Sequence, residues 1–152
     1  MLYRLAATTP TWTTVPLRLA LGGIFLAHGL HNVFGFFGGR GLWAFTAGSA
    51  PLGLKPAWLW LGAAAISELI AGALVLVGLL TRAGAFLILC VMVVAITGVH
   101  WGTFYNPDGI EYPLALLAMA LSLLIVGGGN ASFDLSLSGG GRGRSRRRYM
   151  AR

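Results

Sequence analysis

The chain has 152 residues, a length typical of one domain. Hydrophobic residues make up 57% of it and charged residues only 10%, whereas soluble domains carry roughly 25% charged residues. This composition excludes a soluble enzyme, a disordered chain and a DNA-binding module, and it favours a protein of the lipid bilayer. The single cysteine, Cys90, excludes an internal disulfide, a CxxC redox pair and a cysteine-ligated iron–sulfur cluster.

Four apolar runs predict an all-α integral membrane protein, a four-transmembrane-helix bundle. They cover about residues 15–37, 57–80, 83–101 and 109–126. The first run has 23 residues, enough for roughly 34 Å of helix. The polar pair Thr81-Arg82 is the predicted break between the second and third spans, and so short a break predicts a tight helical hairpin.

A cleaved signal peptide is the alternative for the first run, but that run is too long and carries polar residues.

The segments between these runs carry turn and capping signals. Within the first loop, Leu42–Phe45 is expected to form a short interfacial helix. The turn 106–109 precedes the fourth span, with Asp108 and Glu111 spaced as a capping pair, and Gly127–Asn130 ends that span.

The net charge of +7 lies mostly in the last residues of the chain. Six arginines fall in positions 142–152, so we divide the chain into a membrane domain, 1–137, and a Gly/Arg-rich cytoplasmic tail, 138–152. With Arg4, Arg18 and Arg82, nine basic residues lie on one side of the four spans, against Arg40 and Lys55 on the other. The positive-inside rule then predicts that both termini are cytoplasmic.

Glu68 and His28 are the most informative polar residues. By helical rise each lies about 14 to 16 Å inside its span, near the midplane of a bilayer. A charged side chain there costs about 2.5 to 3.5 kcal/mol, so it faces the bundle, is protonated or pairs. We expect Glu68 and His28 to meet and exchange a proton, which makes them the candidate catalytic residues; the alternative is a carboxyl group that only holds helices together.

Further polar residues are expected to extend this site outwards as a column. His31 and Asn32 follow His28 along the first span, and His100, Glu111 and Tyr112 lie at the predicted outer ends of the third and fourth spans. A bis-histidine haem is not expected, because His28 and His100 differ in depth by more than two helical turns. We expect no metal site, because zinc bound by His31, His100 and Glu111 lacks a local ligand motif.

Short motifs along most of the chain resemble one known family. In chain order they are His28-Gly29, Phe34–Gly39, Ser67-Glu68-Leu69, Gly78–Arg82, His100, Glu111-Tyr112-Pro113 and Ser132–Leu135. Together, over about residues 15–135, they resemble the DoxX family of small bacterial membrane proteins. The resemblance implies a four-helix bundle in the bacterial cytoplasmic (inner) membrane. Relatives of the DoxD branch are associated with thiosulfate:quinone oxidoreductase.

Three classes of function remain open. The first is a DoxX-like membrane subunit of a redox system, of the thiosulfate:quinone oxidoreductase type. In it a quinone is the cofactor, Glu68 and His28 exchange its protons, and the binding residues are His31, Asn32, His100, Glu111 and Tyr112. The second is a non-catalytic accessory or scaffold subunit of a larger membrane complex, and the third a small transporter or proton pathway. The expected partners are membrane lipids and a second protein or a second copy of the chain, not nucleic acid.

The distribution of basic residues generates a first prediction about topology. In a Cys90→Ser background, Gly48→Cys should react with an impermeant thiol reagent added outside the cell, and Ser145→Cys should react only after the membrane is opened. Preferential labelling of residue 145 from outside would overturn the predicted orientation.

Overall fold

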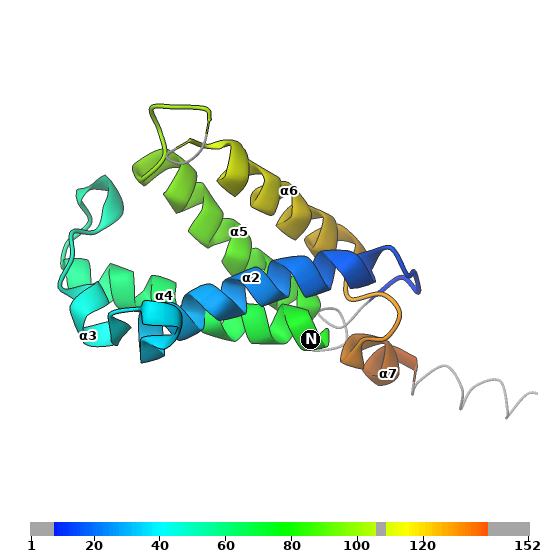
Figure 1. Ribbon diagram of the computed structural model, residues 1–152. Helices are drawn as coiled ribbons and strands as arrows, with labels where there is room; N and C mark the ends of the chain where they lie inside the picture. Colours follow the sequence, from blue (N-terminus) through cyan, green and yellow to red (C-terminus); the bar gives the residue numbers. More distant parts are fainter. Residues whose placement is uncertain (1–7, 106–108, 140–152) are drawn as a thin grey trace, which may run out of the picture.

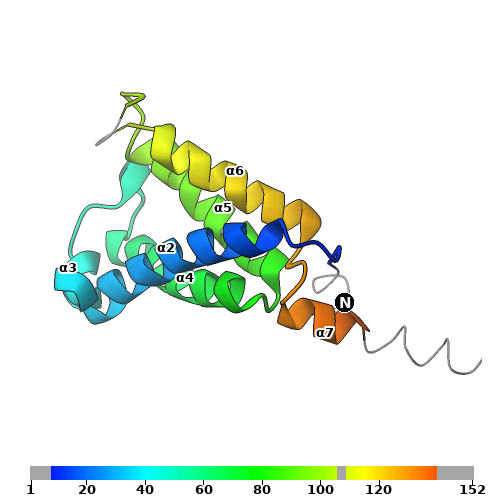
Figure 2. The same cartoon turned by 45° about the vertical axis from the view of Figure 1, so that its right-hand side comes forward.

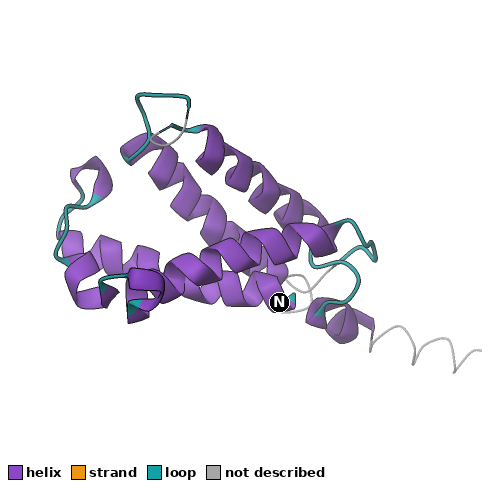
Figure 3. Cartoon of the chain, in the orientation of Figure 1, coloured by secondary structure: helices purple, strands orange, loops and turns teal. Residues whose placement is uncertain are grey.

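The computed structural model describes residues 8–105 and 109–139, and within them every regular element is helical (Figure 3). Four long helices form the body: α2 (Thr14–Phe34), α4 (Ala57–Val77), α5 (Thr81–Gly98) and α6 (Glu111–Val126). The shorter elements are α3 (Gly41–Thr46), α7 (Phe133–Gly139) and two 3-10 turns, η1 (Phe36–Gly38) and η2 (Pro51–Gly53).

The long helices are arranged as two pairs. Helix α2 lies along α4, and α5 lies along α6 (Figures 1 and 2). The pairs meet at the end where α2 begins and α6 ends, which we call the terminal end, and they diverge towards the opposite end, which we call the loop end. Helices α4 and α5 therefore enclose a wedge that widens towards the loop end.

Two of these helices, α4 and α5, are long and apolar enough to cross a membrane. Helix α2 together with the segment Phe36–Gly53 passes the same test as a bent pair, with a 90° bend between them, which brings the number of candidate spans to three. Helix α6 is apolar but has only 16 residues. The described part of the chain is therefore all-helical, with two to three candidate membrane spans.

The helices follow the predicted runs, with one correction at the second break. Thr81 and Arg82 do not separate two helices; they form the first turn of α5. Helix α4 ends earlier because Gly78 adopts a left-handed conformation, φ 72°, and its N–H bonds back to the carbonyls of Leu74 and Val75. The connection is then only residues 78–80, so the predicted tight hairpin is present.

Other local predictions have different outcomes. Helix α3 contains the predicted short helix Leu42–Phe45, and Gly127 ends α6 as predicted. Asp108 lies outside the described residues, and Glu111 opens α6. Helix α7 is an element that the sequence did not reveal, and it runs through the predicted boundary between residues 137 and 138.

Glycines allow α2 and α4 to approach each other closely. A Cβ atom at Gly29 would overlap the backbone of Leu69, and one at Gly72 would overlap the backbone of Leu26. Gly22, at the terminal end, faces the backbone of Leu76 in the same way. In a bilayer, where burial of apolar surface gives little drive for association, such close backbone packing holds helices together.

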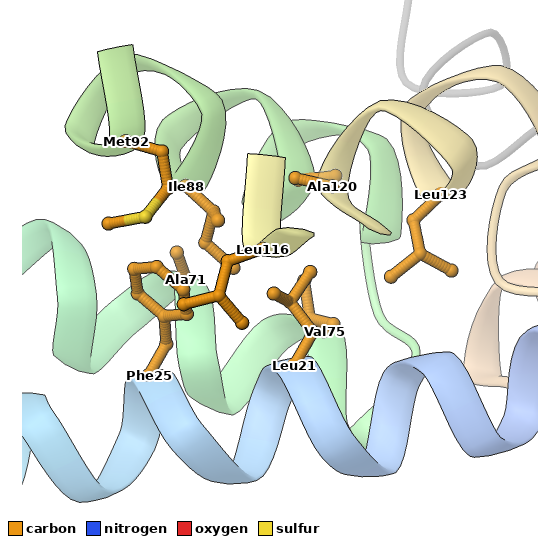
Figure 4. Packing of buried hydrophobic residues seen from close by; sticks show 10 residues of the cluster. Leu21, Phe25, Ala71, Val75, Ile88, Met92, Leu116, Ala120 and Leu123 are labelled. Atoms are coloured by element: carbon orange, nitrogen blue, oxygen red, sulfur yellow. The ribbon is translucent and has the colours of Figure 1, made fainter. Parts of the chain in front are cut away.

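The hydrophobic core joins all four long helices near the terminal end. Figure 4 shows its side chains pointing towards one another: Leu21 and Phe25 of α2, Ala71 and Val75 of α4, Ile88 and Met92 of α5, and Leu116, Ala120 and Leu123 of α6. Most of these residues lie in the half of their helix that faces the terminal end, and Phe25, Met92 and Leu116 lie within about one turn of the midpoint on the other side. The core therefore does not extend to the loop end of the wedge.

A buried arginine links the pairs beyond this core. The side chain of Arg18 in α2 is 4% exposed, and its guanidinium donates hydrogen bonds to backbone carbonyls of two other segments. Nε and Nη2 bond the carbonyls of Val75 and Leu76, each at 3.1 Å, at the end of α4. Nη1 bonds the carbonyls of Gly128, Asn130 and Ala131, at 3.1 to 3.3 Å, in the loop after α6. We call this network the Arg18 clamp.

Asp134 completes the terminal end. Its carboxylate accepts hydrogen bonds from the backbone N–H groups of Leu80, at 2.7 Å, and Thr81, at 2.8 Å, which have no partner within α5. Asp134 is 1% exposed and close enough to Arg18 for electrostatic attraction. Ser132 in turn caps α7 by accepting a hydrogen bond from the N–H of Leu135 at 3.1 Å. Helix α7 is thus fixed to the start of α5.

The Arg18 clamp generates a prediction about stability. Arg18→Met keeps the length and apolar stem of the side chain but leaves buried carbonyls without donors, so it should lower the stability of the folded protein by about 3 to 5 kcal/mol. Arg82→Met is the matched control, because Arg82 donates one exposed hydrogen bond, to the carbonyl of Ile125. Thermal unfolding in detergent should show a large loss for Arg18→Met only; equal melting temperatures for the two variants would contradict the clamp.

Candidate functional site

A cavity of about 470 Å³ lies between α4 and α5 in the open half of the wedge. Helix α4 contributes one wall and α5 the facing wall, while α3 and the residues around η2 cover the loop end. The lining residues are Phe45, Ser49, Pro51, Leu54, Trp60, Leu61, Ala63, Ala64, Ser67, Glu68, Cys90, Val91, Val94, Ala95 and Val99. Most of these are apolar, and Glu68 is the one carboxylate among them.

The loop between α3 and α4 covers this cavity because it reaches across to α5. A Cβ atom at Gly98 would lie 2.7 Å from Cβ of Pro51 and 3.0 Å from Cγ of Leu52. Glycine at position 98 is therefore required for η2 to rest on the end of α5. The contact bridges the two helix pairs at the loop end, as the Arg18 clamp does at the terminal end.

Glu68 is held at the side of the cavity by a residue of α2. The Asn32 side chain donates a hydrogen bond from Nδ2 to Oε2 of Glu68 at 2.8 Å, and both residues are half-buried. Glu68 also lines the cavity, so the carboxylate that Asn32 holds is within reach of a molecule bound there.

His28 is near Glu68 but does not hydrogen-bond it. The two side chains are close enough to interact electrostatically, while His28 itself is exposed. Helical spacing places His28 on the face of α2 that carries Leu21, Phe25 and Asn32, which is the face turned towards the core. The predicted proximity of His28 and Glu68 is therefore present, but the direct contact is made by Asn32, one helical turn away.

The other predicted site residues lie away from the cavity. His31 is half-buried at the end of α2, where a Cβ atom at Gly39 would meet its ring carbon Cγ at 2.9 Å. His100, Glu111 and Tyr112 belong to the loop end of the α5–α6 pair. None of these four residues lines the cavity. The polar residues that were predicted to form one column are thus divided: His28, His31, Asn32 and Glu68 belong to the α2–α4 pair, and the others to the α5–α6 pair.

Cys90 is exposed and lines the cavity. It lies nine residues from the start of α5, and Glu68 lies nine residues from the end of α4. By helical rise both are about 14 Å from the terminal end of their helices. The thiol and the carboxylate therefore lie at the same level on opposite walls.

The few polar groups of the cavity determine which kinds of ligand it can bind. The described residues include no cluster of three or more His, Cys, Asp or Glu side chains that could bind a metal ion. The carboxylate can accept a hydrogen bond, or donate one when protonated, within walls that suit an apolar molecule. This combination suits a ligand with an uncharged hydrogen-bonding head and an apolar body.

Three contributions to this region were missed at the level of sequence. Asn32 orients Glu68, Gly98 seats η2, and Cys90 forms part of the wall. The spacing of four residues between His28 and Asn32, on one face of α2, was the available signal for Asn32. For Gly98 and Cys90 the sequence holds no comparable signal, because both roles depend on how α5 is placed relative to α4.

The helices that form the cavity also lie in the part of the chain that is similar to a known family. No curated protein and no solved structure shows a significant match to the chain. The family model of DoxX matches residues 13–101, which contain α2, α3, α4 and α5 and every residue that lines the cavity. Since this match covers 89 of the 152 residues, the chain belongs to the DoxX family.

Proposed function

We propose that this DoxX protein is a membrane subunit of a redox system and that it binds a quinone in the cavity between α4 and α5. The observation that carries the proposal is the Glu68 carboxylate, held by Asn32 at the side of a mostly apolar cavity. A quinone has the matching form, with two hydrogen-bonding oxygens on a ring and an apolar tail.

The size and composition of the cavity support this ligand. Its volume of about 470 Å³ lies within the range of roughly 300 to 1,000 Å³ that is usual for pockets binding small molecules. Apolar side chains such as Leu61, Val91 and Ala95 suit a ring and an isoprenoid tail. Glu68 offers a hydrogen-bond partner to an oxygen of the quinone ring, and this bond fixes the orientation of the ring.

The roles of the polar residues follow from their positions. Glu68, when protonated, donates a hydrogen bond to a quinone oxygen, and as a carboxylate it accepts one from the reduced hydroxyl. Asn32 positions Glu68. His28, exposed and within electrostatic range, is the proposed route by which Glu68 exchanges protons with water. His31 is the next polar residue along α2, while His100, Glu111 and Tyr112 make no contact with the ligand in this proposal.

We further propose that α2 and α6 cross the bilayer with α4 and α5, with both termini in the cytoplasm of a bacterium. The basic residues support this orientation, and the loop end then faces outwards. Helix α6, with 16 residues, spans about 24 Å, so it crosses most of a 30 Å hydrocarbon core.

A second function, an accessory subunit of a larger complex, is favoured by the aromatic side chains at the loop end. Trp43 is 90% exposed and Tyr105 76% exposed, and Phe37 and Trp101 are also exposed. Aromatic residues are enriched both at membrane interfaces and at the centres of protein interfaces. In this reading Glu68 and Asn32 only join α4 to α2.

Quinone binding can be tested through Trp60, which lines the cavity and should be quenched by a bound quinone. Titration of the protein in lipid nanodiscs with decylubiquinone should give a saturable component of the tryptophan quenching, and this component should be absent in Trp60→Phe. Glu68→Leu should weaken binding about fivefold, because it removes the donor to the quinone oxygen and a hydrogen bond between uncharged groups contributes about 0.5 to 1.5 kcal/mol.

Glu111→Leu is the matched control, because Glu111 lies outside the cavity. It should bind decylubiquinone as the unmodified protein does. Equal affinities of the Glu68→Leu and Glu111→Leu variants, or quenching that never saturates, would refute the proposed site and leave the accessory subunit as the better reading.

A further inference from the structure

We infer that the ligand enters the cavity sideways, from the acyl chains of the bilayer, through an opening between α4 and α5 flanked by Ala63, Cys90 and Val94. The inference rests on the proposed function, since it assumes that the cavity holds a ligand. It narrows the ligand to a lipid-borne amphiphile whose head is uncharged and whose tail remains in the opening.

One side of the opening lies on the outward face of α4. Leu59, Ile66 and Ile70 are all nearly half exposed, at 45 to 48%, and recur at the spacing of one helical face. Ala63 lies on the same face, is exposed, and also lines the cavity. The cavity therefore opens on the side of α4 that a membrane-spanning helix presents to lipid.

The other side lies on the outward face of α5. Phe86 is 53% exposed and Val93 43%, and Cys90 and Val94 lie on the same face. Cys90 and Val94 also line the cavity, whereas Phe86 and Val93 do not. The outward faces of the two helices thus meet at the cavity, so a molecule moving between them comes from the acyl chains.

The depth and the charge of the lining exclude a soluble anion as the occupant. Glu68 and Cys90 lie about 14 Å along their helices, near the middle of a 30 Å hydrocarbon core. Among the described residues, neither lysine nor arginine lines the cavity, and the one charged group is a carboxylate. An anion such as thiosulfate would be desolvated and repelled here.

The residues that cover the loop end of the cavity also indicate that the ligand enters from the acyl chains. Phe45, Pro51 and Leu54 are half-buried and lie over that end of the cavity, and η2 rests on α5 at Gly98. A ligand with a long apolar tail therefore finds its path beside Cys90 and Val94 rather than through this apolar cover. Cys90 and Ala63 have the smallest side chains along this path, which makes them the residues that set its width.

The test narrows the opening at Cys90, which lies on the cavity wall opposite Glu68. Cys90→Phe places a large ring in the opening, and Val93→Phe places the same ring on the same face of α5 but outside the cavity. In stopped-flow quenching of Trp60 by decylubiquinone in nanodiscs, Cys90→Phe should slow association by at least about tenfold, and Val93→Phe should leave it unchanged. Association at the unmodified rate in both variants would overturn the inference while leaving quinone binding intact.

A second measurement needs no ligand, so it distinguishes failure of the opening from failure of the proposed function. Cys90 is the only cysteine and can be labelled with bimane in liposomes of phosphatidylcholine and phosphatidylglycerol. The label should be quenched by lipids carrying a doxyl group at the middle of the chain and not by iodide in the water. Quenching by iodide and not by the doxyl lipids would overturn the inference even where decylubiquinone binds.

Discussion

The guanidinium of Arg18 holds together the three segments that meet at the terminal end. It bonds carbonyls at the end of α4 and in the loop after α6, and the nearby Asp134 offsets its charge. Such carbonyls at helix ends and in tight loops have few other partners in a membrane protein, where an unsatisfied backbone group costs several kcal/mol. One side chain thereby fixes where the two helix pairs converge.

The separation of the two helix pairs at the loop end follows from this arrangement. Because the core and the Arg18 clamp both lie near the terminal end, the pairs are free to diverge towards the loop end, where η2 bridges them at Gly98. The cavity lies between these two fixed points. Glu68 is placed where the core stops, and Asn32 gives it the hydrogen bond that makes a carboxyl group tolerable at that depth. The fold thus creates a mostly apolar cavity with one carboxyl group in its wall.

Much of the fold could be predicted from the sequence, because apolar runs and glycines act locally. The positions of the long helices, the short helix α3 and the tight hairpin after α4 all follow from such signals. The end of α4 was misplaced because Thr81 and Arg82 are polar, yet it is the left-handed Gly78 that terminates the helix. Arg18 was counted only among the basic residues on the predicted cytoplasmic side, because a sequence does not show that the carbonyls it bonds lie within reach.

The candidate site was predicted less completely, for a related reason. Helical rise placed Glu68 and His28 at matching positions along their helices, and the two side chains are within electrostatic range, but such a position does not fix the rotation of one helix against another. That rotation puts Asn32, and not His28, in contact with Glu68. It also turns Cys90 towards the cavity and leaves His100 and Glu111 on the other helix pair. Membership of the DoxX family supports a membrane subunit, and the ligand is inferred from the cavity itself.

The proposed function requires that the cavity between α4 and α5 is closed at the terminal end and binds a ligand from the lipid beside Glu68. A crystal structure grown in a lipid mesophase containing decylubiquinone tests this claim directly. We expect electron density for the ring within hydrogen-bonding distance of the Glu68 carboxylate, with the tail leaving between Ala63 and Cys90. Helices α4 and α5 packed against each other along their whole length, with the quinone elsewhere on the protein, would contradict it.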